Sequence, residues 1–320
     1  MRQHTAAFAL FLLGGVFLLG LLALACGQEE AAMPTPTVTA TATPEATPEA
    51  TPTPLGETPT PSRPLPSPTP TAFTAHFIDV GQGDAILIQA DGTVILVDGG
   101  DASANVEDYL QAQGIQDIDL MVATHPHADH IEGLTDVLAL YDVHEIWTNG
   151  ETHTSQTYED FAAAVAAESA TERDVSRGYS TQMNGLEIDV LHPTSPLSGD
   201  LNEDSVVLQV SCGEVAILLT GDATTDSEAS MQAAGVLSDV EVLKVGHHGS
   251  NTSTSAAFLS AITPEDAVIS VGAGNTYGHP HQETLDRLAA AGVTVYRTDL
   301  DGTVVLTSDC ATYSLEAAGS

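Results

Sequence analysis

The residues best suited to chemistry lie in the segment Thr124–His130, which contains three histidines and one aspartate. This segment follows the apolar run 118–123, and such a run is typical of a buried strand. Imidazole and carboxylate groups are the donors that bind zinc in catalytic sites. The alternative is a solvated, histidine-rich loop, but later parts of the chain supply further donors. The segment therefore predicts a metal site at the end of a strand.

Four more polar clusters follow apolar runs along the chain. They are Asp98–Gly100, Thr220–Asp222, Gly246–Ser250 and Gly278–His281. In layered folds of helices and strands, functional groups gather at strand ends. We therefore expect these clusters to meet the histidine-rich segment at one site.

The elements that position these clusters follow from apolar periodicity. Strands are expected at 74–80, 84–90, 93–97, 118–123, 143–147, 186–191, 205–210, 215–219, 239–245, 266–271, 293–297 and 302–307. Helices are expected at 104–113, 131–140, 156–170, 224–234, 253–261 and 281–291. Ser155 or Thr157 is expected to cap the third helix, and Thr224 or Thr225 the fourth. Hairpins followed by alternating strands and helices predict an α/β (α+β) domain with four layers, αββα.

In their order, the clusters resemble the metallo-β-lactamase superfamily, and within it the extracellular domain of ComEC-like competence proteins. The motifs behind the resemblance are His76–Ala85, Thr124–His130, Leu218–Asp222, Leu243–Ser250, Tyr277–His281 and Arg297–Asp299. The resemblance implies a metallo-β-lactamase-like sandwich and hydrolysis by a metal-activated water. We expect the hydrolase-like domain to carry over, and not DNA uptake through a membrane channel.

The resemblance also implies ligands for one or two divalent ions, Zn or Mn. His125 and His127 correspond to first-metal histidines, and Asp129 and His130 to second-metal ligands. Asp222 corresponds to the carboxylate that bridges the two ions.

The last ligand histidine of the family corresponds to His247, with His248 as the competing assignment. Asp98 corresponds to the aspartate that orients the histidine loop from behind, and a plain turn residue is its alternative. Asp129 also corresponds to a position suited to accepting a proton. His248 and His279 are candidates for holding the substrate or protonating the leaving group.

His281 is a further candidate for a substrate contact, and loop packing is its alternative. Lys244 is the only lysine of the chain and lies in a buried-looking strand. A contact with a phosphate and a structural ion pair are both open for it.

One departure from the family concerns the first metal. Its members usually carry a histidine about twenty residues before the bridging aspartate, but Leu201–Ser205 contains none. Asn202, Asp204 or His192 is expected to help, or a water fills the place, with Ser205 close by. The first site is therefore expected to be weak, or to hold manganese rather than zinc.

The charge of the chain limits its partners. Seven Lys and Arg oppose 44 Asp and Glu, which gives a formal net charge of −37. Such a surface repels polyanions, and no basic stripe of a nucleic-acid binder is present. We therefore expect a phosphodiester or another small anionic substrate, with nucleic acid disfavoured although the family motifs favour a nuclease-like enzyme.

Two other functions remain open from the sequence. One is hydrolysis of a different ester or amide, as in a phosphocholine or teichoic-acid esterase, a lactonase or a β-lactamase. The missing first-site histidine argues against a β-lactamase. The other is a non-catalytic metal-binding module, which retention of Asp129 and Asp222 argues against.

Residues 1–25 predict export. Residues 6–25 are almost wholly apolar and follow Arg2, as in a secretory signal or a membrane anchor. Leu22–Cys26 resembles a bacterial lipoprotein cleavage box, although Ala23 stands where leucine is usual. Cleavage there would leave Cys26 as a lipidated N-terminus. An uncleaved bilayer-spanning helix is the alternative, and both place the remainder outside the cytoplasm, anchored or secreted.

Two further segments complete the expected organisation. Residues 26–72 hold most of the 17 prolines together with many threonines, which predicts a disordered, extended stalk. Residues 73–320 form the hydrolase domain, which is long enough for a sizeable core. Cys212 and Cys310 are its cysteines, and one disulfide or two buried thiols are both open.

Overall fold

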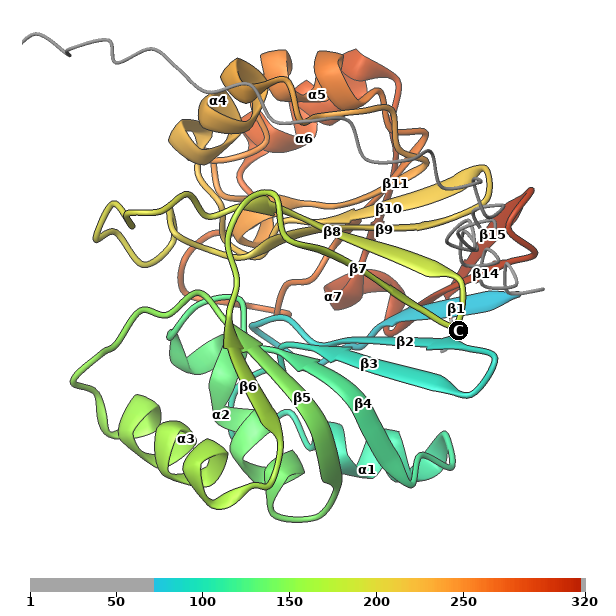
Figure 1. Ribbon diagram of the computed structural model, residues 1–320. Helices are drawn as coiled ribbons and strands as arrows, with labels where there is room; N and C mark the ends of the chain where they lie inside the picture. Colours follow the sequence, from blue (N-terminus) through green and yellow to red (C-terminus); the bar gives the residue numbers. More distant parts are fainter. Residues whose placement is uncertain (1–71, 318–320) are drawn as a thin grey trace, which may run out of the picture. The chain divides into compact units, whose positions relative to one another are not determined.

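Two β-sheets lie face to face, and helices cover the outer face of each (Figure 1). The computed structural model describes residues 72–317. The expected leader 1–25, the lipidated Cys26 and nearly all of the expected stalk 26–72 lie outside these residues. Between residues 72 and 317, none of the helices has the length and apolar character needed to span a bilayer.

The first sheet has the strand order β15-β14-β1-β2-β3-β4-β5-β6. The neighbours from β3 to β6 are parallel, so their carboxyl ends meet at one edge. The strands are β1 (Phe73–Phe77), β2 (Ile86–Ala90), β3 (Thr93–Val97), β4 (Asp117–Val122), β5 (Asp142–Thr148), β6 (Thr171–Asp174), β14 (Val304–Ser308) and β15 (Tyr313–Ala317).

The second sheet has the order β13-β12-β11-β10-β9-β8-β7, and its strands from β10 to β13 are parallel. The strands are β7 (Ser180–Met183), β8 (Leu186–His192), β9 (Val207–Cys212), β10 (Val215–Leu219), β11 (Val242–Lys244), β12 (Asp266–Ile269) and β13 (Thr294–Arg297).

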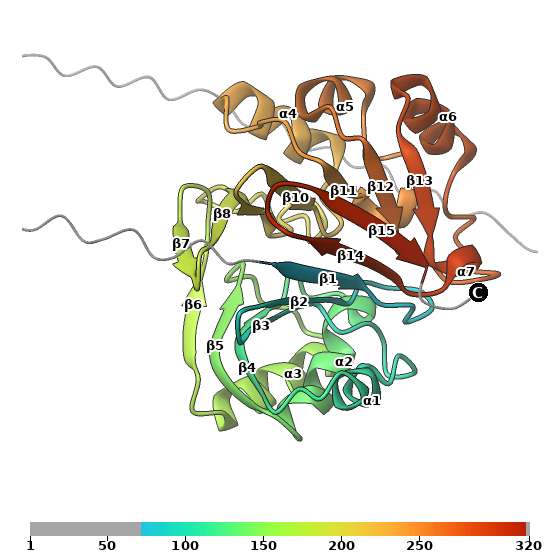
Figure 2. The same cartoon turned by 90° about the vertical axis from the view of Figure 1, so that its right-hand side faces the viewer.

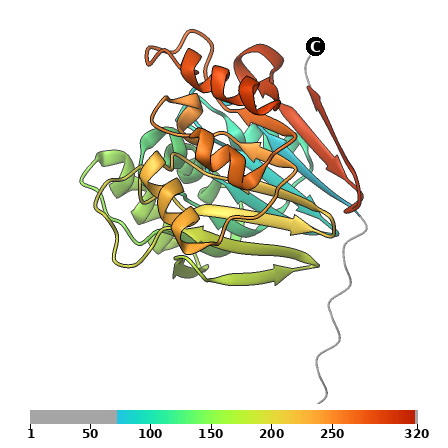
Figure 3. The same cartoon turned by 90° about the horizontal axis from the view of Figure 1, so that it is seen from above.

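The helices separate into two groups, one on each outer face (Figure 2). On the first sheet lie α1 (Val106–Ala112), α2 (Ala128–Leu138) and α3 (Gln156–Ala167). On the second lie α4 (Thr225–Ala234), α5 (Ala256–Ile262) and α6 (Gln282–Ala291), which Figure 3 shows as gold and orange helices across that sheet. A short α7 (Thr298–Asp301) follows β13, and a 3-10 turn η1 (Gly246–Gly249) follows β11.

Three apolar clusters hold the layers together. The central cluster lies between the sheets and joins side chains such as Ile88 and Leu120 of the first to Ile188 and Ile217 of the second. The outer clusters pack the helices onto each sheet. Burial of apolar area at about 25 cal/mol per Å² is the main force behind such packing. The expected four-layer αββα fold is confirmed.

The sequence missed three strands and α7. All of β6 is exposed, and β7 and β15 alternate between exposed and half-buried residues. These strands lie at or next to sheet edges, where apolar alternation is weak. The expected caps are found: the side chain of Ser155 accepts a hydrogen bond from the amide of Tyr158, and that of Thr224 from the amide of Asp226.

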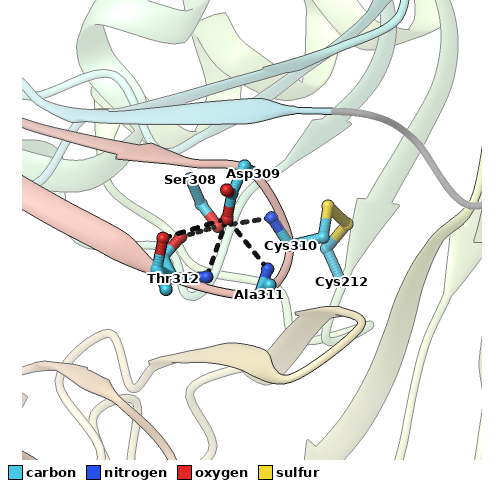
Figure 4. Close-up of a disulfide and its surroundings, with 6 residues drawn as sticks. All are labelled: Cys212, Ser308, Asp309, Cys310, Ala311 and Thr312. Carbon is cyan, nitrogen blue, oxygen red and sulfur yellow. Dashed lines mark hydrogen bonds between the residues drawn. A yellow bond between two sulfur atoms is a disulfide. The ribbon is translucent and has the colours of Figure 1, made fainter.

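A disulfide joins the two sheets. Cys212 ends β9 and Cys310 follows β14, with their Cα atoms 4.9 Å apart (Figure 4). The turn around Cys310 is fixed by Asp309, whose carboxylate accepts the amides of Ala311 and Thr312 at 3.1 and 2.7 Å. Of the two alternatives for these cysteines, the structure shows the disulfide.

Removal of this disulfide is expected to destabilise the fold. It closes a loop of sequence separation 98, so the double variant Cys212→Ser/Cys310→Ser is expected to lose about 2–4 kcal/mol of unfolding free energy. Urea denaturation measures the loss. A reductant should lower the midpoint of the wild type and leave that of the variant unchanged. Equal midpoints for the unreduced wild type and the variant would contradict the expectation.

Candidate metal centre

The polar clusters lie at the carboxyl ends of strands from both sheets. Asp98 follows β3, and the segment His125–His130 leads from β4 into α2. From the second sheet, Asp222 follows β10 and the pair His247–His248 follows β11. The shared edge of the parallel strands therefore brings these side chains together, as the sequence predicts.

Asp222 lies at the centre of this group and is only 2% exposed. Its Oδ1 atom lies 3.4 Å from Nε2 of His130 and 3.4 Å from Nε2 of His248. Its Oδ2 atom lies 3.8 Å from Nε2 of His125 and 3.7 Å from Nε2 of His247. Each oxygen of one carboxylate thus faces its own pair of imidazole nitrogens.

On the Oδ1 side, Asp129 completes a set of donors. Its Oδ2 atom lies 3.3 Å from Nε2 of His248, and Asp129, His130 and His248 form a group with ligand atoms close enough for one ion. Nε2 of His130, Nε2 of His248 and Oδ1 of Asp222 are buried without a hydrogen-bond partner. Buried polar atoms rarely remain unpaired, so this side fits a divalent cation.

On the Oδ2 side, His125 and His127 meet Asp222. Nε2 of His125 lies 2.9 Å from Nδ1 of His127, and the three residues form a second group within reach of one ion. Imidazole and carboxylate donors suit Zn or Mn. His247 approaches the same carboxylate oxygen from β11.

Contacts behind the ligands fix the orientation of the rings. Asp98 is fully buried, and its carboxylate accepts the amide and the hydroxyl of Thr124 at 2.8 and 2.7 Å. The same carboxylate accepts Nδ1–H of His130 at 2.8 Å. Nδ1–H of His248 donates to the carbonyl of Ser270 at 3.0 Å. Each bond leaves Nε2 of the ring free to bind a metal.

The loop that carries the histidine pair has an unusual backbone. His247 and His248 have φ values of 48° and 53°, in the left-handed region. Such conformations cost about 1–3 kcal/mol each outside glycine and cluster at functional sites. Gly249 has φ of 81°, and a Cβ there would lie 2.5 Å from Cβ of Pro280. Close packing therefore holds the pair in place, with one ring on each side of Asp222.

This geometry changes one assignment. The sequence favoured His247 as the last family ligand, with His248 as the competing assignment. In the structure it is His248 that is buried and contacts both Asp129 and Asp222, in a group that could hold one ion. His247 instead faces the Oδ2 side with His125. The competing assignment therefore fits the structure, and His248 lies among the potential ligands.

The two sides differ in protonation. On the Oδ1 side, burial favours neutral rings, but the carboxylate of Asp222 outweighs it and raises the pKa of His130 well above its usual value. The same carboxylate, with Asp129 and Asp84, raises the pKa of His248 to about 10. On the Oδ2 side, burial lowers the pKa values of His125, His127 and His247. These three imidazole rings are therefore neutral at pH 7.

Sequence reasoning missed the role of Asp84. Its Oδ2 atom lies 2.6 Å from Nζ of Lys244, and both side chains are fully buried. Lys244 also donates to the carbonyl of Val245 at 2.9 Å. Of the alternatives for Lys244, the structure shows the ion pair. A lone lysine in a buried strand requires a buried carboxylate, and that requirement could have pointed to Asp84 within the motif His76–Ala85.

The segment Asn202–Ser205 helps to hold the backbone of Asp222 in place. Ser205 accepts the amide of Asp222 with its hydroxyl at 3.2 Å. Asn202 accepts the amide of Ser205 with its carbonyl at 3.1 Å. Asp204 is buried and accepts from Ser198 and Gly199.

Neither Asp204 nor His192 replaces the missing first-site histidine. Nδ1 of His192 lies 3.3 Å from Nη2 of Arg177. Between residues 72 and 317, no group of side chains that could hold a metal includes Asp204 or His192. His247 faces Oδ2 of Asp222, so it is the histidine placed to supply the donor that Leu201–Ser205 lacks.

A hollow of about 240 Å³ opens over the site, lined among others by Gln82, Asp129, His248, Tyr277 and His279. Burial and the neighbouring rings lower the pKa of His279 to about 4. His281 does not line this hollow, and its Nδ1 accepts the amide of Asn251 at 3.0 Å. The structure thus brings His279 to the site and uses His281 to hold two loops together.

Comparison with known proteins agrees with this geometry. The sequence profile of the Metallo-beta-lactamase superfamily matches residues 78–273. The chain is 32% identical over 247 residues to ComE operon protein 3 of Bacillus subtilis (strain 168), covering 71% of this chain and 32% of that protein. It is 34% identical over 229 residues to Competence protein ComA of Neisseria gonorrhoeae, covering 70% and 30%. The chain spans about a third of the length of these relatives.

Two solved structures share the fold. The metallo-beta-lactamase fold protein YhfI from Bacillus subtilis has a TM-score of 0.51 at 12% identity, covering 74% of this chain and 100% of that one. The diiron β-hydroxylase CmlA from Streptomyces venezuelae has a TM-score of 0.51 at 16% identity, covering 75% and 55%. The resemblance to ComEC-like proteins is confirmed by the sequence relatives. With its donor set and a profile match over more than half of its length, the chain belongs to the metallo-β-lactamase superfamily.

Proposed function

We propose that this chain is a metal-dependent phosphodiesterase that acts outside the cytoplasm. The observation that carries the proposal is the carboxylate of Asp222, each oxygen of which faces two imidazole nitrogens. Such a carboxylate suits a pair of ions, and paired ions are typical of enzymes that cleave phosphate esters.

Two sets of residues would hold the ions. His125, His127 and His247 would hold one with Oδ2 of Asp222. Asp129, His130 and His248 would hold the other with Oδ1. A bound divalent ion supplies a water of lowered pKa and polarises a phosphoryl oxygen.

The remaining chemistry belongs to side chains that face the hollow. The side chain of Asp129 is 30% exposed, and its pKa lies well below the usual value: although burial opposes ionisation, His248 and His130 outweigh it. It is therefore ionised at pH 7, which is the form that binds a metal or accepts a hydrogen bond from a water, but its low pKa makes it a weak base. His279, with its pKa of about 4, is neutral at pH 7. It is suited to donating one hydrogen bond to the substrate, and not to acting as a cationic acid.

The substrate class follows from the donors and the charge. Two dications offset the carboxylates at the site, which makes it attractive to a small anion. The remaining surface of a chain with net charge −37 repels a long polyanion. The competence proteins match this chain over only about a third of their length, so we propose phosphodiester cleavage without DNA uptake.

The proposed location rests on two features. A disulfide persists in oxidising compartments outside the cytoplasm. The apolar segment 6–25 and the proline-rich segment 26–72 suit a membrane anchor followed by a spacer. We therefore propose that the hydrolase domain 73–320 lies outside the cytoplasm and is anchored to the cell membrane, through a lipidated Cys26 or through an N-terminal helix.

Hydrolysis of bis-p-nitrophenyl phosphate tests the function. The chain is stripped with a chelator and reloaded with Mn²⁺ or Zn²⁺, and activity is expected to return only with metal. Nitrocefin should remain intact, and His144→Ala, which changes an exposed histidine outside the site, should retain full activity. Turnover of nitrocefin with none of the phosphodiester would overturn the proposal, as would activity that survives complete removal of metal.

A further inference from the structure

Tyr277 presents an exposed aromatic ring at the mouth of the metal centre. It is 64% exposed, and only Leu140 and Leu300 match it among the large apolar side chains between residues 72 and 317. A single exposed apolar residue is ordinary, but Tyr277 lines the same hollow as Asp129 and Asp222. Its position therefore places an aromatic face where a substrate would enter.

The ring is held in place before any substrate arrives. It stacks on His279 with centroids 5.8 Å apart and an interplanar angle of 25°. His279 in turn meets His247 edge-on at 5.5 Å, and His247 faces Asp222. The side-chain oxygen of Asn275 accepts the amides of Tyr277 and His279 at 3.2 and 3.0 Å. Such a preformed surface lowers the entropy lost on binding.

The charge around the ring indicates what it binds. Residues 267–282 contain no Asp, Glu, Lys or Arg, in a chain with 44 Asp and Glu. Recognition of a cation by an aromatic ring gains from nearby carboxylates or further rings in a cage. The loop itself offers no carboxylate, and the carboxylates of Asp129 and Asp222, which line the same hollow, face the imidazole of His248. An uncharged planar group gains from offset stacking on a single flat face. The loop therefore suits a planar, neutral ring.

We propose that Tyr277 is a specificity-determining residue that stacks an uncharged heterocycle, such as a nucleobase, carried beside the scissile phosphate. The proposal rests on the proposed phosphodiesterase function and narrows its substrate class. Stacking requires an unpaired ring, so single nucleotides and single strands fit, whereas bases inside a duplex do not. The stacking energy also gives a nucleotide affinity that does not depend on a basic surface.

Three esters with the same p-nitrophenolate leaving group test the proposal on the metal-loaded full chain. They carry thymidine, methyl or choline as the group that stays on the phosphate. The wild type is expected to prefer the thymidine ester over the methyl ester by roughly tenfold in kcat/KM. Tyr277→Ala should lose this preference through KM, with kcat unchanged, and Tyr277→Phe should keep it. Leu140→Ala is the matched control, because it removes a similarly exposed side chain just beyond the C-terminal end of α2.

The outcomes separate this inference from the function on which it rests. If Tyr277→Ala keeps the thymidine preference, or loses activity only on the choline ester, the stacking role is wrong and the phosphodiesterase stands. If the wild type cleaves no ester with Mn²⁺ or Zn²⁺, the function falls. Calorimetric binding of thymidine 5′-phosphate then decides the stacking role: roughly tenfold weaker binding by Tyr277→Ala supports it, and equal binding overturns it.

Discussion

Asp222→Asn is expected to lose bound metal on both sides of the site and to reduce kcat/KM on bis-p-nitrophenyl phosphate by roughly a thousandfold. Among residues 72–317, Asp222 is the residue whose two carboxylate oxygens face both sets of donors. A metal ion stabilises charge in the transition state by several kcal/mol, and about 4 kcal/mol corresponds to a thousandfold in rate. Asparagine preserves the shape of the side chain, so the fold is expected to survive.

Metal analysis, steady-state kinetics and circular dichroism check this prediction together. The matched control is Glu228→Gln, which changes another buried carboxylate. Glu228 is 4% exposed and accepts the amides of Thr254 and Ser255, away from the metal donors. It should lose stability while keeping metal and activity. Wild-type turnover by a folded Asp222→Asn protein would rule out the assignment of the bridging carboxylate.

The two sides of the site are expected to bind metal with different dependence on pH. In the metal-free protein, Asp222 and its neighbours raise the pKa of His248 to about 10 and also raise that of His130. Both rings therefore carry protons at pH 7, and an ion on the Oδ1 side must displace them. Its affinity should rise with pH up to about 10, by about tenfold per unit for each proton displaced.

The Oδ2 side should behave differently. Burial lowers the pKa values of His125, His127 and His247, so these rings are neutral at pH 7. They therefore release no proton when a metal binds. Its affinity should change little between pH 7 and pH 8. Titration calorimetry with Mn²⁺ at pH 6, 7 and 8, in buffers of different ionisation enthalpy, counts the protons released. His248→Ala should lower the number of protons released on the Oδ1 side by one, because His130 keeps its own proton. Equal proton release for the two equivalents of metal would contradict the predicted difference.

The parts of the site that sequence predicted are those with a local signal. The segment 125–130 carries four donors within six residues, so its chemistry is visible without a fold. The pair His247–His248 is ambiguous because two adjacent histidines differ only in the direction of their side chains. Left-handed backbone at both residues and packing of Gly249 against Pro280 decide that direction, and neither feature is encoded in residue types alone.

The same reasoning explains the errors in the fold. Strands with one buried face, such as β1 and β8, show apolar periodicity and were found. An exposed edge strand such as β6 has no buried face and leaves no pattern. The partnership of Asp84 with Lys244 joins residues 160 positions apart in the chain, as their numbers show. Such a pair is set by the packing of a loop of the first sheet against β11 of the second, and a single sequence does not show which distant segments meet.

The position of the disulfide has a consequence for life in a metal-poor medium. Cys212 lies at the end of β9 that pairs with the start of β10, whereas Asp222 follows the other end of β10. One margin of the sandwich is therefore held by a disulfide, and the proposed metal ions would lie at the opposite margin. If the proposed function holds, we expect the metal-free protein to lose activity but stay folded, and to regain activity when metal is supplied again.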